Sequence, residues 1–157
     1  MADPFETWSL DREIVLAKVL NHPRDKVFAA WLDPEALAEW YGPAGLSIEN
    51  HEADIRVGGV WRFDMVGMFE GREQRFANRF LEIVPNERIV VDYGAPDPDD
   101  PDHFRMTVTF DEQADGKTVL TKRQLHPSRE RRQAVIDFGA VEYGMQTLDG
   151  LTTWLES

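Results

Sequence analysis

The chain has 157 residues, carries 17 Lys and Arg against 29 Asp and Glu for a net charge of −12, and contains no cysteine. This length suits one domain with a proper core. The acidic balance argues against binding to duplex nucleic acid or to an anionic membrane, because both require a basic face, and the lack of cysteine excludes disulfides, thiolate metal sites and cysteine nucleophiles.

Neither the composition nor the first residues point to a membrane or to export. No apolar run approaches the ~18 residues of a membrane-spanning helix. The start, MADPFETWSLDRE, is acidic and lacks the basic and apolar segments of a signal peptide. A cytoplasmic protein without membrane insertion is therefore expected.

The N-terminal part is expected to comprise a short arm and a first strand. Residues 1–9 form the arm, in which Phe5 and Trp8 are candidates for packing on the body or for holding a homodimer together. Residues 10–157 form a single domain. Its first strand spans 10–20, where β-branched residues are frequent. Because both alternating rows are fairly apolar, this strand is expected to have neighbours on both sides.

Two proline signals then predict two short helices. Proline suits the first turn of a helix, where its missing N–H costs no hydrogen bond. His22-Pro23 opens the first helix. Asp33-Pro34, with Asp33 as N-cap, opens the second, which ends at the Tyr41-Gly42-Pro43 stop.

From residue 46 to residue 125 the pattern changes to strands separated by turn residues. The predicted strands are 46–54, 59–66, 74–84, 88–93, 103–111 and 118–125. Asp115-Gly116 is a strong hairpin signal, because a type I′ turn needs positive φ at its centre. The short connections favour antiparallel pairing. With the first strand, these segments make a seven-stranded antiparallel sheet in an α+β fold.

Alternation along the strands indicates which side chains face the core. Two rows form the predicted inner wall: Trp61, Phe63 and Met65 on one strand, and Phe104, Met106, Val108 and Phe110 on another. The register of residues 76–83 stays open. Either Phe76, Asn78 and Phe80 or Ala77, Leu81 and Ile83 face inward, and a bulge could switch faces midway.

Residues 128–157 have the 3.6-residue period of a long amphipathic helix, with Ser128 as N-cap and a break near 137–139. Its apolar face consists of Val141, Met145, Leu148, Thr152 and Leu155, widened by Leu151 and Trp154. A glycine in a helix interior costs ~1 kcal/mol relative to Ala. Gly144 therefore predicts close approach of backbone or ligand, whereas Gly150 suits an exposed face. This helix is expected to cover the concave face of the sheet.

Several short motifs accompany this β-α-α-β6-α order. They are His22-Pro23, Val27-Phe28-Ala29-Ala30-Trp31, Asp33-Pro34-Glu35, Trp40-Tyr41-Gly42-Pro43, Val57-Gly58-Gly59, Trp61-Arg62-Phe63, Leu81-Glu82-Ile83-Val84-Pro85, Glu87-Arg88-Ile89, Thr107-Val108-Thr109-Phe110, Gly139-Ala140-Val141-Glu142, Gln146-Thr147-Leu148-Asp149 and Leu151. In their order and spacing, residues 10–156 resemble the START-like (SRPBCC) helix-grip superfamily, and in particular its bacterial homologues of the activator of the heat-shock protein 90 ATPase.

The resemblance implies a curved antiparallel sheet wrapped around the C-terminal helix, with a deep hydrophobic cavity between them. Known activities of the superfamily include lipid and polyketide binding, cyclisation and chaperone contact. The candidate cavity residues are Trp31, Trp40, Tyr41, Trp61, Phe63, Met65, Met68, Phe76, Asn78, Phe80, Met106, Phe138, Val141, Glu142 and Met145. Aromatic and methionine side chains suit an adaptable apolar pocket, although the same residues could simply make core.

Two charged residues complicate the apolar interpretation. Glu142 follows Val141 at the edge of the apolar stripe, where a carboxylate with a raised pKa could act as a general base or a surface Glu could pair with a cation. Lys122 falls where an inward apolar residue is expected, and a Lys facing a cavity is costly unless it is paired. Either Lys122 contacts a ligand, or the register turns Val119, Thr121, Arg123 and Leu125 inward.

No metal or cofactor is expected. His51 and Glu52 are neighbours on a strand, so they should point to opposite faces and should not chelate together. The acidic run at 97–102 lacks the mid-loop glycine and closing Glu of a calcium loop and is interpreted as a solvated loop at the pocket mouth. No nucleotide-binding, zinc-protease or serine-hydrolase motif is present.

Three functions remain, and binding of a small hydrophobic molecule leads. In that hypothesis the two short helices and the 67–71 loop gate the cavity. The second is a cyclase or hydrolase that uses Glu142, Tyr41, Tyr143 or Asn78 in the same cavity. Contact with a chaperone ranks lowest, because a net charge of −12 offers no obvious complement to an acidic partner.

Overall fold

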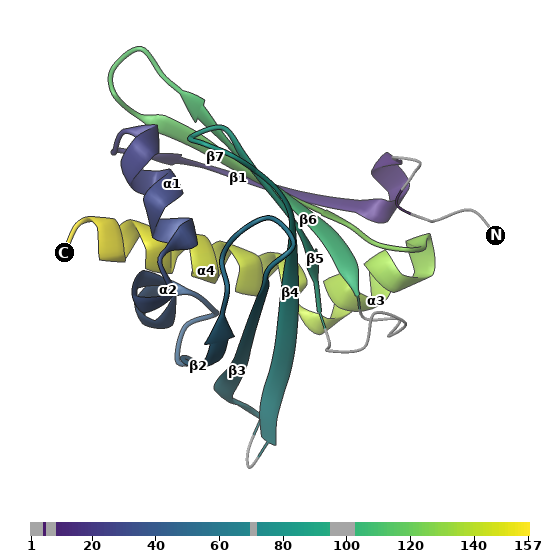
Figure 1. Cartoon of the computed structure of the whole chain (residues 1–157). Helices are drawn as coiled ribbons and strands as arrows, with labels where there is room; N and C mark the ends of the chain where they lie inside the picture. Colours follow the sequence, from purple (N-terminus) through teal and green to yellow (C-terminus); the bar gives the residue numbers. More distant parts are fainter. Residues whose placement is uncertain (1–4, 6–8, 70–71, 95–102) are drawn as a thin grey trace.

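The computed structural model describes residue 5 and residues 9–69, 72–94 and 103–157 (Figure 1). The expectations for Trp8, for the end of the 67–71 loop and for the acidic run at 97–102 fall on residues outside this part. The strands are β1 (Glu13–Leu20), β2 (Ser47–Ala53), β3 (Val60–Phe69), β4 (Arg72–Val84), β5 (Arg88–Tyr93), β6 (Phe104–Glu112) and β7 (Thr118–Leu125). The helices are α1 (Arg24–Leu32), α2 (Pro34–Trp40), α3 (Arg129–Phe138) and α4 (Ala140–Leu155), and a short 3-10 turn, η1 (Leu10–Arg12), precedes β1.

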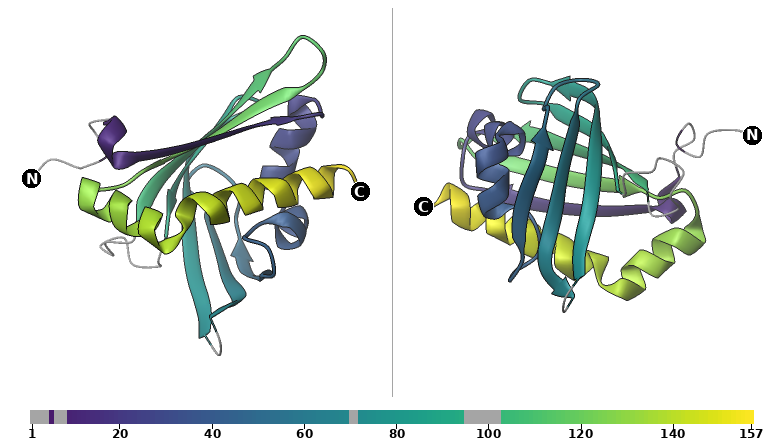
Figure 2. Two further views of the ribbon diagram at one scale, coloured as in Figure 1. Left: turned by 180° about the vertical axis from the view of Figure 1, so that it is seen from behind. Right: turned by 60° about the horizontal axis from the view of Figure 1, so that its bottom comes forward.

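The strands form one antiparallel sheet in the order β1-β7-β6-β5-β4-β3-β2. Strands β2 to β7 pair as a meander, and β1 joins it by pairing with β7. Figures 1 and 2 show the sheet strongly curved, with α4 lying across its concave side. The predicted α+β helix-grip fold is confirmed.

The prediction for the first strand is wrong in two respects. Residues 10–12 form the turn η1 instead of extending the strand. Strand β1 is an edge strand, whose one neighbour among the described residues is β7. Its outer row is apolar but exposed, with Val15 at 46% and Val19 at 55%. Two apolar rows indicated burial on both faces, yet only the row that faces α4 and the core is covered.

The terminal segment begins and breaks where the sequence predicts. The Ser128 hydroxyl accepts a hydrogen bond from the Arg131 backbone N–H at 3.0 Å, and this cap starts α3. Gly139 ends α3 with φ of 110°, a left-handed conformation that favours glycine, and α4 follows at a new angle (Figure 2). The buried positions of α4 are Gly144, Thr147, Leu148 and Leu151. The buried face of α4 therefore contains Gly144 and Thr147, whereas the predicted Val141 and Met145 are only half-buried.

Helices α1 and α2 lie beside the C-terminal part of α4 (Figure 1). The Asp33 carboxylate caps α2 by accepting from the Glu35 N–H at 3.0 Å. Trp31 and Trp40 pack edge to face at 5.0 Å between ring centroids, and the Trp40 indole N–H donates to the Ala30 carbonyl at 3.1 Å. The end of the concave face beside α1 and α2 is therefore occupied by packed aromatic side chains.

Strand β4 settles the register that the sequence left open. Asn78 and Phe80 are buried and Phe76 stacks on the buried Phe63 ring, so this row faces inward. The pairing with β5 shifts between Phe80 and Glu82, and beyond this bulge Ile83 packs against the core. None of the helices in the described part of the chain is long and apolar enough to cross a membrane.

Gly150 does not lie on an exposed face, contrary to expectation. A Cβ built on it would sit 2.8 Å from the Trp40 carbonyl oxygen, at the point where α4 crosses the end of α2. An added methyl group would collide with backbone, which cannot rotate away as a side chain can.

Replacing Gly150 by Ala should therefore destabilise the protein by about 1–2 kcal/mol, as overpacking does. At an open helical position the same change would stabilise it by ~1 kcal/mol. Urea unfolding measures the difference. Thr153→Ala, on the exposed side of the same helix, is the control and should change little. Stabilisation by Gly150→Ala would contradict the close contact.

Candidate functional site

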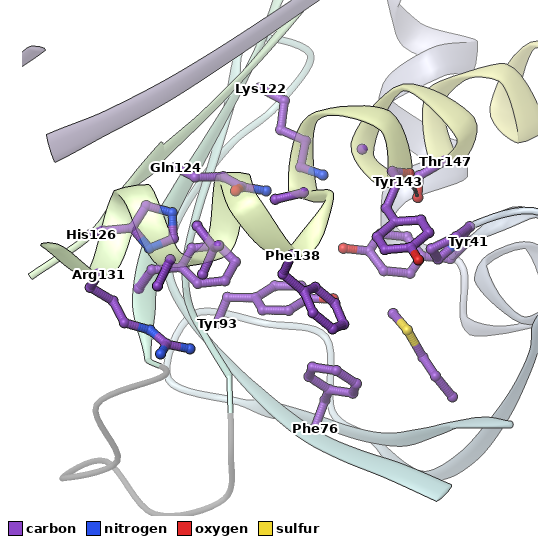
Figure 3. A pocket seen from close by; sticks show the side chains of 17 residues that line it. Tyr41, Phe76, Tyr93, Lys122, Gln124, His126, Arg131, Phe138, Tyr143 and Thr147 are labelled. Atoms are coloured by element: carbon purple, nitrogen blue, oxygen red, sulfur yellow. Dashed lines mark hydrogen bonds between the residues drawn. The ribbon is translucent and has the colours of Figure 1, made fainter. Parts of the chain in front are cut away.

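A pocket of about 470 Å³ lies between the inner face of the sheet and helices α3 and α4 (Figure 3). This volume is within the range of small-molecule sites, roughly 300–1,000 Å³. Its lining comprises Tyr41, Pro43, Met65, Phe76, Tyr93, Phe104, Lys122, Gln124, His126, Arg131, Ala134, Val135, Phe138, Ala140, Tyr143, Gly144 and Thr147. These residues come from the end of α2, from five strands and their ends, and from both C-terminal helices.

One wall of the pocket is aromatic. The Phe76 and Tyr93 rings lie 5.6 Å apart, and Tyr93 stacks on Phe104 at 4.8 Å. Tyr41 joins this wall to the core, with its ring 5.3 Å from Trp61. Burial raises the pKa of both Tyr41 and Tyr93, and for Tyr41 the interaction with Tyr93 adds to the effect. Both hydroxyls therefore stay protonated across the physiological range.

A row of polar side chains lies on the other side, on alternate residues of β7 and its end. Lys122, Gln124 and His126 are 5%, 9% and 1% exposed, and alternate residues of a strand share a face. Figure 3 shows the three along one side of the pocket, with Phe76 on the opposite side. The register is therefore the one that turns Lys122 inward, while Arg123 pairs with Glu13.

Lys122 makes no hydrogen bond or ion pair with any residue in the described part of the chain. Burial lowers the pKa of its amine from 10.5 to about 8, because a low-dielectric surrounding disfavours the charged form. At neutral pH the amine is still mostly protonated. The pocket wall thus contains a positive charge without a counter-charge among the described residues.

His126 occupies the end of the row that is nearest to α3. Neither of its ring nitrogens has a hydrogen-bond partner among the described residues, and its ring lies 4.9 Å from Phe104. Burial, together with the charges of Arg131 and Arg132, lowers its pKa to about 4. The imidazole is therefore neutral at pH 7 and has both nitrogens available to a ligand.

Four of the predicted site residues line this pocket, namely Tyr41, Met65, Phe76 and Phe138. Six others are buried aromatic or methionine side chains of the core: Trp31, Trp40, Trp61, Phe63, Phe80 and Met106. The buried Asn78 also lies outside the lining. The reason is that α1 and α2 occupy the end of the concave face where most of these side chains point. The side chain of Met68 is outside the described part.

On α4 the prediction was displaced by one or two residues. Val141 and Met145 are half-buried and outside the lining, and Glu142 is exposed. The neighbouring Tyr143 and Gly144 line the pocket instead, since each helical residue is rotated by about 100° from the last. No carboxylate is among the lining residues. A general base at Glu142 is therefore not placed to act in this pocket.

The sequence interpretation missed most of the polar side of the site. Gln124 and His126 were not chosen, although they continue the period of two that Lys122 begins. Arg131, Ala134 and Val135 were missed because α3 was expected to be only the start of the terminal helix. No local pattern indicated that the bend at Gly139 would turn this segment over the open end of the sheet.

A separate cluster lies on the opposite, outer side of the sheet. Oxygens of Glu49 and Asp64 and a nitrogen of His51 lie within 4.8 Å of one another, and could hold a metal ion. The expectation concerned His51 with Glu52, and Glu52 is not part of this cluster because its carboxylate accepts from Arg62 Nε at 3.0 Å. His51 Nε2 lies 2.9 Å from Asp64 Oδ2, and this contact accounts for the approach of these two side chains without a metal.

Comparison with known proteins gives one family. The profile of the family described as activator of Hsp90 ATPase homolog 1-like protein matches residues 21–156. A search of the curated proteins found no match.

Solved structures share the fold over almost their entire length. A crystal structure of a protein from Chromobacterium violaceum is 29% identical, with a TM-score of 0.77, and the match covers 90% of this chain and 95% of that one. A crystal structure from Nitrosomonas europaea is 22% identical, with a TM-score of 0.84, covering 95% and 97%. A solution structure from Arthrobacter aurescens is 22% identical, with a TM-score of 0.83, covering 99% and 90%.

Proposed function

Because this chain belongs to the family of activator of Hsp90 ATPase homolog 1-like proteins, we propose that it binds a small hydrophobic molecule in the pocket between the sheet and the C-terminal helices. The fold is one that often holds such ligands. The observation that carries the proposal is the pocket of about 470 Å³ with an aromatic wall. A well-packed core has few voids larger than a water molecule, so a space of this size beside a fully packed aromatic core is typical of a binding site.

Binding is favoured over the cyclase or hydrolase alternative because the residues named for catalysis are poorly placed or poorly tuned as bases. Proton abstraction needs a base with a pKa near the working pH. Glu142 and Asn78 lie outside the lining, and burial raises the pKa of Tyr41. Of the four residues proposed for catalysis, Tyr143 and Tyr41 alone remain beside the pocket. A few polar groups in a mostly apolar site are what ligand orientation requires.

Titration with N-phenylnaphthylamine, a neutral probe that becomes fluorescent in apolar surroundings, should give saturable binding of one probe per chain. Extraction of the purified protein with organic solvent, followed by mass spectrometry, should detect any molecule carried from the host. The control is protein unfolded in urea, which should not bind the probe. Linear, non-saturating fluorescence together with an empty extract would overturn the proposal.

A further inference from the structure

Lys122 is the unusual feature of the pocket, because its charge is buried without a counter-charge in the described part of the chain. Several exposed and half-buried cations elsewhere are paired, as in Lys18 with Asp149, Arg105 with Asp92 and Arg62 with Glu52. The chain has 29 Asp and Glu, yet none of those in the described part lines the pocket. Burying a charge is unfavourable unless a partner is supplied. A bound anion is the partner that this arrangement lacks.

The position of the amine supports a role toward a ligand. An added Cβ at Gly144 would lie 3.8 Å from Lys122 Nζ, so the amine reaches from β7 to the surface of α4. A Cβ there would be in ordinary van der Waals contact with the amine. The amine therefore lies in the pocket wall beneath the helix, where a ligand between sheet and helix would meet it.

Gln124 and His126 continue the polar row that begins at Lys122, and both are neutral groups that can donate hydrogen bonds. Successive inward residues of a strand are about 7 Å apart, so one small anion can touch two neighbours of the row but not all three. The amide of Gln124 lies between the other two. On the β7 side, the Lys122 ammonium with neutral donors beside it matches one anionic group, while Arg131, the other cation of the lining, lies on α3. The facing wall of Met65, Phe76 and Phe138 matches an apolar body.

We infer that the hydrophobic ligand proposed above is an apolar carboxylic acid, bound as its carboxylate by Lys122 and Gln124, with its apolar part against the aromatic wall. This inference rests on the proposed function and adds the class of ligand. Charge-assisted hydrogen bonds in a dry site are stronger than neutral ones, so the acid should be preferred to its neutral analogues.

The groups around Lys122 define how binding should depend on pH. Tyr41, Tyr93 and Tyr143 face the pocket from α2, β5 and α4, and Arg131 faces it from α3. The lowered pKa of His126, about 4, keeps it neutral above pH 7, and burial keeps Tyr41 and Tyr93 protonated. Lys122, with a pKa of about 8, is thus the group that loses its charge as the solution is made mildly alkaline.

The test compares decanoic acid with decanol and methyl decanoate by isothermal titration calorimetry at pH 7. Decanoate should bind at least about 10-fold more tightly than either neutral analogue, as expected for a hydrogen bond to a charged group. Lys122→Met should remove most of this preference. Lys26→Met, at an exposed position of α1, is the matched control and should retain the preference. In wild type, decanoate alone should weaken as pH rises through about 8.

The outcomes separate the two proposals. Binding of all three compounds with equal affinity, in wild type and in Lys122→Met, would overturn the acid preference and leave hydrophobic binding intact. An acid preference that persists in Lys122→Met would also overturn it. No binding of any compound, together with no binding of the neutral fluorescent probe, would overturn the proposed function itself.

Discussion

Replacing Lys122 by Met should raise the free energy of unfolding at pH 7 by about 3 kcal/mol. Burial lowers the pKa of this amine from 10.5 to about 8, and each pKa unit corresponds to about 1.4 kcal/mol. Methionine has a similar length without the charge. The variant should therefore keep the packing and lose the cost of burying an ammonium group.

The stabilisation of the protein by Lys122→Met should decrease as the pH rises. Below about pH 8 Lys122 is charged in the folded and unfolded chain alike, and the full cost of burial is present. Between about 8 and 10.5 the folded protein releases the proton first, so wild-type stability rises with pH. The difference between wild type and Lys122→Met should shrink across this window.

Urea unfolding at a series of pH values measures this effect. Lys26→Met, at an exposed position, should change the free energy of unfolding by no more than about 0.5 kcal/mol at any of them. A Lys122→Met protein that is no more stable than wild type at pH 7 would show that the ammonium is compensated inside the protein. The acid-preference inference would then lose its main support.

Gly144→Leu should abolish binding of the neutral fluorescent probe while the fold survives. A Cβ at this position would lie 2.5 Å from Leu16 Cδ1, the far end of a flexible side chain that can move aside. The remaining leucine atoms would occupy the pocket beside Lys122. The expected cost in stability is about 1–3 kcal/mol, which a domain of ordinary stability tolerates.

Fluorescence titration and circular dichroism distinguish blocking from unfolding. Glu142→Leu adds the same side chain two residues earlier on the exposed side of α4, and should bind the probe as wild type does. Full probe binding by a folded Gly144→Leu protein would place the binding site elsewhere. Loss of probe binding in Glu142→Leu would indicate that the Glu142 carboxylate takes part in binding.

The fold was predictable because its signals are local and repeated. Alternation of Trp61, Phe63 and Met65, the turn at Asp115-Gly116 and the cap at Ser128 each specify one element from a few residues. Their order then leaves few topologies. The position of β1 at the edge of the sheet was not predictable in the same way. Apolar residues on its outer row are typical of a buried strand, and the sequence does not show that no further strand pairs with it.

The site was predicted less well because a pocket is a product of tertiary packing. Trp31 and Tyr41 have similar sequence signals, but only Tyr41 reaches the pocket, since α1 packs Trp31 into the core. Glu142 points to solvent, whereas the next residue of the same helix, Tyr143, lines the pocket. The best sequence signal was the anomaly at Lys122, a charge on an apolar row, and it coincides with the polar side of the cavity.

The aromatic wall also places intrinsic fluorophores next to the pocket. A ligand that touches Tyr41 is one ring away from three indoles, because Trp31, Trp40 and Trp61 surround that side chain at 5.9, 5.3 and 5.3 Å between centroids. Tyrosine and tryptophan this close exchange excitation energy efficiently. A ligand bound beside Tyr41 should therefore change the intrinsic emission of the protein, so that binding can be followed without a label through residues that also hold α1 and α2 against the sheet.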